Sequence, residues 1–269
     1  MITFFRTILL YSTAAAATIV LGLSVIIAGL LGVKDKPGGL YDKVPRWWSA
    51  AVLWMTGVKV RVHGTENAKS GEPHIFASNH VSWFDVPALA KVLPRYKFVA
   101  KAELFKVPIF GPAMRSVGMI EIQRENRKAA FGAYDVAAER IRAGNSVVVF
   151  PEGTRGHAYP LRPFKKGPFV LAIAAGVPIV PIITHGTIEV MPKGSLWVHP
   201  GTIDIHFLEP VSTTGVDYDH REALMQKVRT RMADAMRELY GVEALPTSAS
   251  RLSSSAEMLS SEVDPTETR

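Results

Sequence analysis

The stretch HIFASNHVSWFDVPALAKVLPRYKFVA at residues 74–100 decides the fold of this 269-residue chain. It holds two short strand-like runs, His74–Ser78 and Tyr96–Ala100, on either side of a helical pattern over Asp85–Leu93. A strand, a helix and a second strand in this order form the unit from which parallel sheets are built. The sequence therefore predicts an α/β fold.

The same alternation extends from Val58 to Tyr240. Further strands are predicted at 58–62, 119–123, 146–150, 179–183 and 202–208, and further helices at 127–143 and 220–240. Gly144 and Gly241 stand where these two helices should end. We expect a mixed, largely parallel sheet flanked by helices.

An uncharged apolar stretch, Thr7–Val33, precedes this pattern. As a helix it would be roughly 40 Å long, enough to cross a ~30 Å hydrocarbon core with tilt. A cleaved signal peptide is the alternative, but the stretch is too long for one and no small-x-small cleavage site follows it. We therefore expect a retained N-terminal membrane helix.

A second apolar stretch, Trp47–Val58, is too short to span a membrane and holds three of the five tryptophans. Indole rings favour the headgroup boundary, which predicts an interfacial helix; a buried helix of the globular domain is the alternative. Residues 1–57 are thus the predicted anchor. Basic residues outnumber acidic ones just after Val33, which predicts a domain on the cytoplasmic face, and we expect a bacterial inner membrane.

Composition narrows the class of protein. The chain has no cysteine, which excludes disulfides, thiol nucleophiles and cysteine metal sites. Its net charge is +7, and because residues 246–269 hold two arginines against four acids, residues 1–245 carry +9. A basic body attracts polyanions, but the basic residues are scattered and form no nucleic-acid-binding motif, which favours anionic lipid or phosphorylated ligands. Residues 246–269 are predicted to be a disordered tail.

The first chemistry-bearing motif is NHVSWFD at 79–85, which places His80 after a strand and Asp85 at the start of a helix. A turn would return the carboxylate to the imidazole, holding one ring nitrogen and leaving the other to accept a proton. The alternative is that Asp85 only caps its helix.

The second motif, FPEGTRG at 150–156, also follows a strand. Gly153 lets the backbone approach an anion and Arg155 supplies a charged fork of donors, so the loop is suited to a phosphate. Glu152 would repel a phosphate, and we expect it to accept a hydrogen bond from a substrate hydroxyl or to position Arg155. A plain polar turn is the alternative.

Two further cations, Lys101 and Arg124, end predicted strands as well. Parallel strands bring such ends to one edge of the sheet, where α/β proteins bind ligands. A base and an anion clamp at this edge indicate chemistry on a hydroxyl of a phosphorylated molecule. No grouping of His, Asp and Glu has the sequence spacing of a zinc site, so no metal is predicted.

These motifs resemble the blocks of the glycerolipid acyltransferases, specifically the 1-acyl-sn-glycerol-3-phosphate (lysophosphatidate) acyltransferase family. NHVSWFD resembles the NHxSxxD block, FPEGTRG the FPEGTRS-type block, and VPIVPI at 177–182 the fourth block, within a resemblance over residues 58–210. GMIEIQR at 118–124 resembles the second block, but Glu121 and Gln123 replace the usual Phe and Asp.

The resemblance implies direct acyl transfer from acyl-CoA or acyl-carrier protein to the sn-2 hydroxyl of lysophosphatidate, with no other cofactor and no acyl-enzyme. It implies a domain at 58–245 in which His80 is the general base and Asp85 its partner. The residues that it places in substrate binding are Lys101, Arg124, Glu152, Gly153, Thr154 and Arg155. The oligomeric state is left open.

Three other functions stay open on the sequence. The same chemistry could act on another lysophospholipid or an aminolipid. A lipid-phosphate hydrolase would use His80 to activate water, although it would normally need a metal or a nucleophile. A non-enzymatic binder of anionic membranes would leave both motifs without a role.

Overall fold

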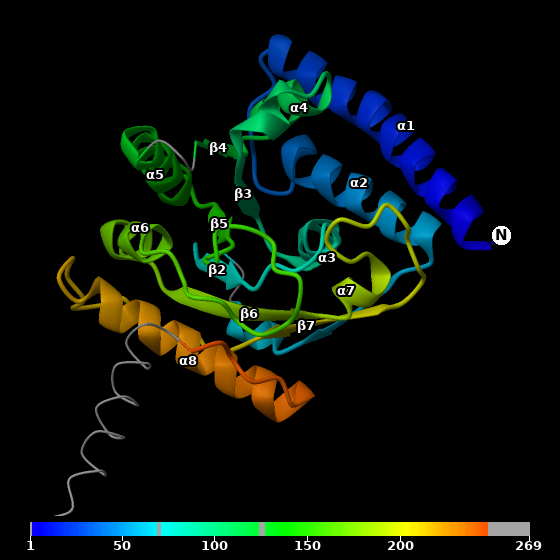
Figure 1. Ribbon diagram of the computed structural model, residues 1–269. Helices are drawn as coiled ribbons and strands as arrows, with labels where there is room; N and C mark the ends of the chain where they lie inside the picture. The colour runs from blue at the N-terminus through cyan, green and yellow to red at the C-terminus, as the bar shows by residue number, and fades with distance from the viewer. Residues whose placement is uncertain (1, 69–70, 124–126, 247–269) are drawn as a thin grey trace, which may run out of the picture.

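The computed structural model describes residues 2–68, 71–123 and 127–246, and side chains are described for all of these except residues 2, 3 and 127–131. Its centre is a seven-stranded sheet in the order β1-β7-β6-β2-β5-β3-β4 (Figure 1). Every neighbouring pair is parallel except β6 and β7. The predicted mixed, largely parallel sheet is therefore confirmed. The strands are β1 (Lys59–His63), β2 (Ile75–Ser78), β3 (Tyr96–Lys101), β4 (Ile120–Ile122), β5 (Ser146–Val149), β6 (Ile179–His185) and β7 (Thr202–Phe207).

Helices cover both faces of the sheet (Figure 1). One apolar core lies between the sheet and α5, α6 and α8, and the other lies between the sheet and α2 and α3, with Leu10 of α1. The described helices are α1 (Ile2–Leu30), α2 (Leu40–Thr56), α3 (Asp85–Val92), α4 (Phe110–Ser116), α5 (Arg127–Arg142), α6 (Gly167–Ala175), α7 (Thr187–Val190) and α8 (Arg221–Tyr240), with short 3-10 turns η1 (Thr65–Asn67) and η2 (Ala102–Lys106).

The central strand β2 carries the chain to the candidate site. All four of its residues are buried, with Ile75 and Ala77 in one core and Phe76 in the other. Asn79, the next residue, donates to the carbonyl of Thr184 at 2.9 Å and accepts its N–H at 2.8 Å. The exit of β2 is thus tied to β6, and His80 emerges at the carboxyl edge of the sheet.

The N-terminal helices differ in part from expectation. α1 is long and apolar enough to cross a membrane, as predicted. α2 begins at Leu40 instead of Trp47, because Pro45 is tolerated within its early turns and Gly39 starts the helix. Trp47 and Trp54 are 51% and 79% exposed, whereas Val52 and Leu53 are fully buried. α2 is therefore a core helix on one side and presents indole rings to the outside on the other.

An ionic cluster ties the loop between α1 and α2 to the sheet. Lys97 of β3 is 1% exposed, and its ammonium group lies 3.2 Å from Asp35 and 2.8 Å from the carbonyl of Val117. Arg95 also contacts Asp35, at 3.1 Å. Burial lowers the pKa of Lys97, and Asp35 opposes that shift because a nearby carboxylate favours the charged amine.

Candidate active site

His80 and Asp85 are in contact. Nδ1 of His80 lies 2.7 Å from Oδ2 of Asp85, whose side chain is fully buried. The imidazole stacks on the ring of Phe150 at 3.9 Å between centroids, which fixes its plane. Since Oδ2 of Asp85 accepts the Nδ1–H of His80, the other ring nitrogen, Nε2, is the one left to act as a base. No described residue has a hydrogen bond to Nε2.

Asp85 closes the turn that carries His80. The same Oδ2 accepts the N–H groups of Val81 at 2.8 Å and Ser82 at 2.9 Å. These groups precede α3, and Oδ1, the other oxygen of Asp85, has no hydrogen-bond partner among the described residues, so the interpretation of Asp85 as a simple helix cap is wrong. Ser82 donates to the carbonyl of Met191 at 2.7 Å, which turns its hydroxyl into the fold.

The FPEGTRG segment forms a tight turn after β5. The N–H of Gly153 donates to the carbonyl of Phe150 at 2.9 Å, with Pro151 inside the turn. Gly153 has φ +80°, a backbone conformation that favours glycine. The N–H of Gly156 then donates to the carbonyl of His80 at 2.7 Å. The two motifs, about 70 residues apart, therefore lie side by side.

Glu152 lies elsewhere than expected. Its side chain is 2% exposed, its Oε1 accepts the N–H of His80 at 3.0 Å, and its Oε2 accepts Nε–H of Arg162 at 3.0 Å. The turn brings the carboxylate to the backbone of His80, just after β2, and to the side chain of Arg162. Glu152 was expected to bind a substrate hydroxyl or to position Arg155. The structure instead pairs it with the backbone of His80 and with Arg162.

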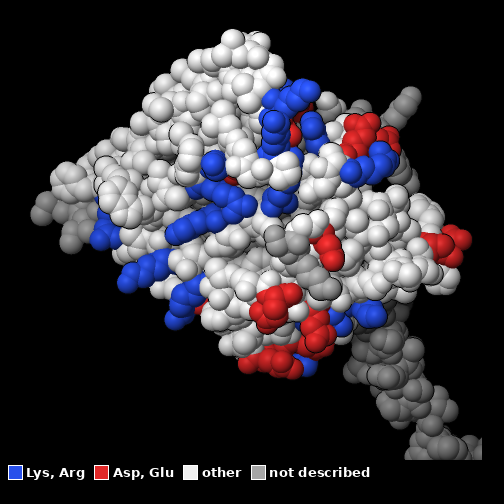
Figure 2. Space-filling model, turned by 180° about the vertical axis from the view of Figure 1, so that it is seen from behind, with Lys and Arg blue, Asp and Glu red and all other residues white. Residues whose placement is uncertain are grey.

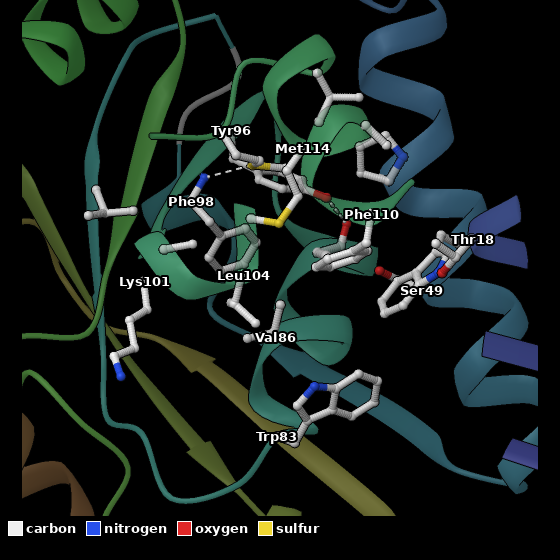
Figure 3. A pocket seen from close by; sticks show the side chains of 18 of the residues that line it. Thr18, Ser49, Trp83, Val86, Tyr96, Phe98, Lys101, Leu104, Phe110 and Met114 are labelled. Atoms are coloured by element: carbon white, nitrogen blue, oxygen red, sulfur yellow. Dashed lines mark hydrogen bonds between the residues drawn. The ribbon is translucent and has the colours of Figure 1, made fainter. Parts of the chain in front are cut away.

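A cavity of about 640 Å³ brings the candidate residues together. His80, Lys101, Gly153, Thr154 and Arg155 all line it, and apolar side chains from α1, α2, α3, β3 and α4 form most of the remaining wall (Figure 3). The prediction that the imidazole and the guanidinium share one pocket is confirmed. The wall therefore combines a few polar groups with a larger apolar surface.

The cations differ in how they meet this cavity. No described group forms a hydrogen bond or ion pair with the guanidinium of Arg155, so it is available to an anion. Lys101 is 52% exposed and pairs with Glu103 at 3.2 Å. Figure 3 shows Lys101 at the margin of the apolar side chains, with its amine directed away from them. Arg124 lies outside the described residues.

Sequence reasoning missed the part that α1 and α2 play in this cavity. Thr18 of α1 accepts Nε1–H of Trp48 of α2 at 3.0 Å, and both line the wall, as does Ser49 (Figure 3). Isolated hydroxyls within apolar stretches were the available signal. The segment assigned to anchoring therefore also builds the pocket.

A second cluster of potential ligands lies on β1 and β7. His63, Asp204 and His206 place ligand atoms within 4.8 Å of one another. Arg61 already binds both oxygens of Asp204, at 2.7 and 2.8 Å, and Nε2 of His206 is paired with the hydroxyl of Tyr240 at 2.7 Å. A metal ion would compete with these contacts. Sequence spacing hid the cluster because β1 and β7 are far apart along the chain.

Comparison with known proteins places this geometry in a family. Residues 59–185 match the family described as Acyltransferase. The 1-acyl-sn-glycerol-3-phosphate acyltransferase alpha of Homo sapiens is 33% identical over 199 residues, which cover 73% of this chain and 70% of the human protein. The chain belongs to the 1-acyl-sn-glycerol-3-phosphate acyltransferase family.

Two further kinds of relative, plant proteins and a solved structure, are also similar to this chain. The chloroplastic BAT2 protein of Brassica napus, a 1-acyl-sn-glycerol-3-phosphate acyltransferase by name, is 32% identical over 228 residues, 81% of this chain. The chain spans 65% of that protein's length and 49% of a chloroplastic Arabidopsis thaliana relative. The crystal structure of the LPA acyltransferase PlsC from Thermotoga maritima superposes with a TM-score of 0.75 at 26% identity, covering 88% of this chain and 95% of that one.

Proposed function

We propose that this protein transfers a fatty acyl group from a thioester donor, acyl-CoA or acyl-carrier protein, to the sn-2 hydroxyl of lysophosphatidate, forming phosphatidate. The observation that carries the proposal is the shared cavity, whose wall combines an imidazole, a guanidinium that no described group pairs with, and a larger apolar surface. The names of the human and plant relatives support the same acceptor.

The arrangement supports general base catalysis without a covalent enzyme intermediate. Nε2 of His80 takes the proton of the acceptor hydroxyl as its oxygen attacks the thioester carbonyl carbon. The carbon–sulfur bond then breaks, and the leaving thiolate takes the proton back from the imidazolium. Asp85 keeps Nδ1 protonated and stabilises the imidazolium, in the way the acid of a Ser-His-Asp triad does.

The polar and apolar parts of the acceptor suit the polar and apolar groups of the cavity wall. Arg155 can form charge-assisted hydrogen bonds with the phosphate, and Lys101 adds positive charge at the margin. The acyl chains suit the apolar wall, where burial of each CH₂ contributes about 0.8 kcal/mol. Because α1 and α2 form part of that wall, a lipid chain can reach His80 without leaving an apolar environment.

We propose that the catalytic domain lies on the cytoplasmic side of a membrane that α1 contacts. Phe4, Phe5 and Leu30 on α1 are 51%, 64% and 84% exposed. Seen from behind in Figure 2, the α1 side at the upper left carries almost no charge, while Lys and Arg gather next to it and Asp and Glu lie farther away. Anionic headgroups would meet such a basic band.

The test is an acyl-transfer assay on the full chain in detergent micelles, with lysophosphatidate and labelled acyl-CoA. The wild type should form phosphatidate, and His80→Ala should lower kcat by ~10²–10⁴-fold because the base is lost. Arg155→Ala should raise the acceptor KM far more than the donor KM. Wild-type turnover by His80→Ala, or an unchanged acceptor KM for Arg155→Ala, would contradict these roles.

Control reactions separate the alternatives. Replacing lysophosphatidate by another lysophospholipid or an aminolipid tests the acceptor, and replacing acyl-CoA by acyl-carrier protein tests the donor. Release of free fatty acid or of inorganic phosphate in place of phosphatidate would indicate a hydrolase. Vesicle binding with no turnover on any of these substrates would indicate a membrane-binding protein.

A further inference from the structure

Arg162 lies behind the FPEGTRG turn and outside both motifs. Its Nε–H donates to Oε2 of Glu152 at 3.0 Å, and its Nη2–H group donates to the carbonyl of Thr154. Its side chain is 29% exposed and forms no part of the cavity wall. Arg162 therefore contacts the 150–156 turn without lining the cavity.

Through Glu152, Arg162 is also connected to the candidate base. The other carboxylate oxygen, Oε1, accepts the backbone N–H of His80 at 3.0 Å. The Glu152 side chain is 2% exposed, and a buried carboxylate is costly unless it is paired and fully hydrogen-bonded. Arg162 supplies the one ion pair that Glu152 makes among the described residues.

The segment that carries Arg162 is held in turn by α8. Arg229 is 7% exposed and donates from Nη2 to the carbonyl of Leu161 at 3.1 Å. Lys193 holds the other end of the turn, donating to the carbonyl of Arg155 at 2.8 Å. Arg162 thus has a fixed backbone, and its guanidinium has two fixed acceptors.

We propose that Arg162 is a positioning residue for the acyl transfer: it holds the Glu152 side chain in place against the backbone of His80, and so sets the distance between His80 and the 153–155 backbone. This inference rests on the proposed function. Glu152 and Arg162 then act as one unit that places base and phosphate site relative to each other. Displacement of a reacting group by about 1 Å can cost ~10²-fold in rate.

The experiment compares Arg162→Gln and Arg162→Lys with the wild type in the micelle assay. Arg162→Gln should lower acceptor kcat/KM by ~10–10²-fold through both kcat and acceptor KM, with the donor KM within about twofold. Arg162→Lys keeps the charge and should recover most of the loss. Glu152→Gln combined with Arg162→Gln should be no worse than the more impaired single variant, because the two act together.

The matched control is Arg231→Gln. Arg231 is 31% exposed, pairs with Glu209 and donates to backbone carbonyls of residues 209 and 210, remote from the cavity. The Arg231→Gln protein should lose about as much thermal stability as the Arg162→Gln protein and keep the wild-type kinetic constants.

A folded Arg162→Gln protein with wild-type kcat and acceptor KM would overturn this inference and leave the proposed function standing. If Arg162→Gln does not fold, a folded Glu152→Gln protein with wild-type kcat and acceptor KM would overturn the inference instead. A wild type without acyl transfer would overturn the proposed function as well.

Discussion

At the scale of single residues, one oxygen of Asp85 does most to shape the candidate site. It accepts three N–H groups, from the His80 ring and from the backbone of Val81 and Ser82, all within 2.9 Å. The five-residue spacing of His80 and Asp85 is therefore a closed turn. The same contact that orients the imidazole also holds the backbone around it.

Asp85→Asn should lower kcat by ~10²–10⁴-fold, because an amide cannot stabilise the imidazolium and favours the wrong tautomer. It should also lower the free energy of unfolding by about 1–3 kcal/mol, since two buried N–H groups lose a charged acceptor. Steady-state kinetics and urea unfolding in detergent measure the two effects.

Asp217→Asn is the matched control for Asp85→Asn. Asp217 accepts Nδ1–H of His220 at 2.7 Å and two backbone N–H groups, but it is exposed and remote from the cavity. It should leave kcat unchanged. An Asp85→Asn enzyme as active as the Asp217→Asn enzyme would show that the buried pair is structural only.

At the scale of elements, histidines join β6 and β7 to the end of α8. The ring of His185 stacks on Tyr240 at 3.7 Å, and His206 shares a hydrogen bond with the Tyr240 hydroxyl. Burial lowers the pKa of His185. It also lowers the pKa of His206, where His63 adds to the effect. Both rings are therefore neutral in the folded protein at a pH where the unfolded chain begins to bind protons.

This packing predicts that the free energy of unfolding decreases as the pH is lowered. Below the ordinary pKa of about 6.5, the unfolded state binds more protons at these rings than the folded state, so stability falls as pH falls. The urea midpoint of the wild type should drop between pH 7.5 and 5.5, and the drop should shrink in a protein with His185→Gln and His206→Gln. His199→Gln, an exposed position, is the control and should keep the wild-type slope. Equal slopes in all three proteins would count against the explanation.

Periodicity located the strands but not every helix. All seven strands were predicted within a few residues, because each is a short β-rich run with a clear boundary. α4, α6 and α7 were missed: α4 and α7 have only seven and four residues, and α6 has no polar side chain to mark an amphipathic period. The early start of α2 was missed because the prediction followed the apolar stretch from Trp47, and the first turns of the helix hold the charged residues Asp42, Lys43 and Arg46.

At the scale of the whole molecule, the N-terminal half of α1 lies against the loop before β7. Thr7 accepts the N–H of Val198 at 3.2 Å, and the rings of Phe4 and Trp197 pack together with 6.3 Å between their centroids. Leu196 and Trp197 in that loop are 69% and 50% exposed. The exposed apolar surface of α1 therefore continues onto a loop of the catalytic domain.

We expect this loop to meet the same membrane as α1. Leu196→Glu with Trp197→Glu should weaken binding to anionic vesicles by about tenfold or more, because two apolar side chains are lost from the lipid contact. Vesicle flotation measures the bound fraction. Leu239→Glu, on an exposed position of α8 across the sheet, should bind as the wild type does. Equal flotation of all variants would show that α1 alone makes the contact.

By itself, the sequence determined the strands, the His80–Asp85 turn and the glycine-dependent turn at 150–153, because each depends on residues close together along the chain. Only the tertiary structure decided the partners of Glu152, the contribution of α1 and α2 to the cavity, and the cluster around Asp204. Those depend on contacts between segments that local periodicity does not relate. The physical reason is that a buried charge finds its partner through the packing of distant elements, and that packing is specified by the whole core and not by any one segment.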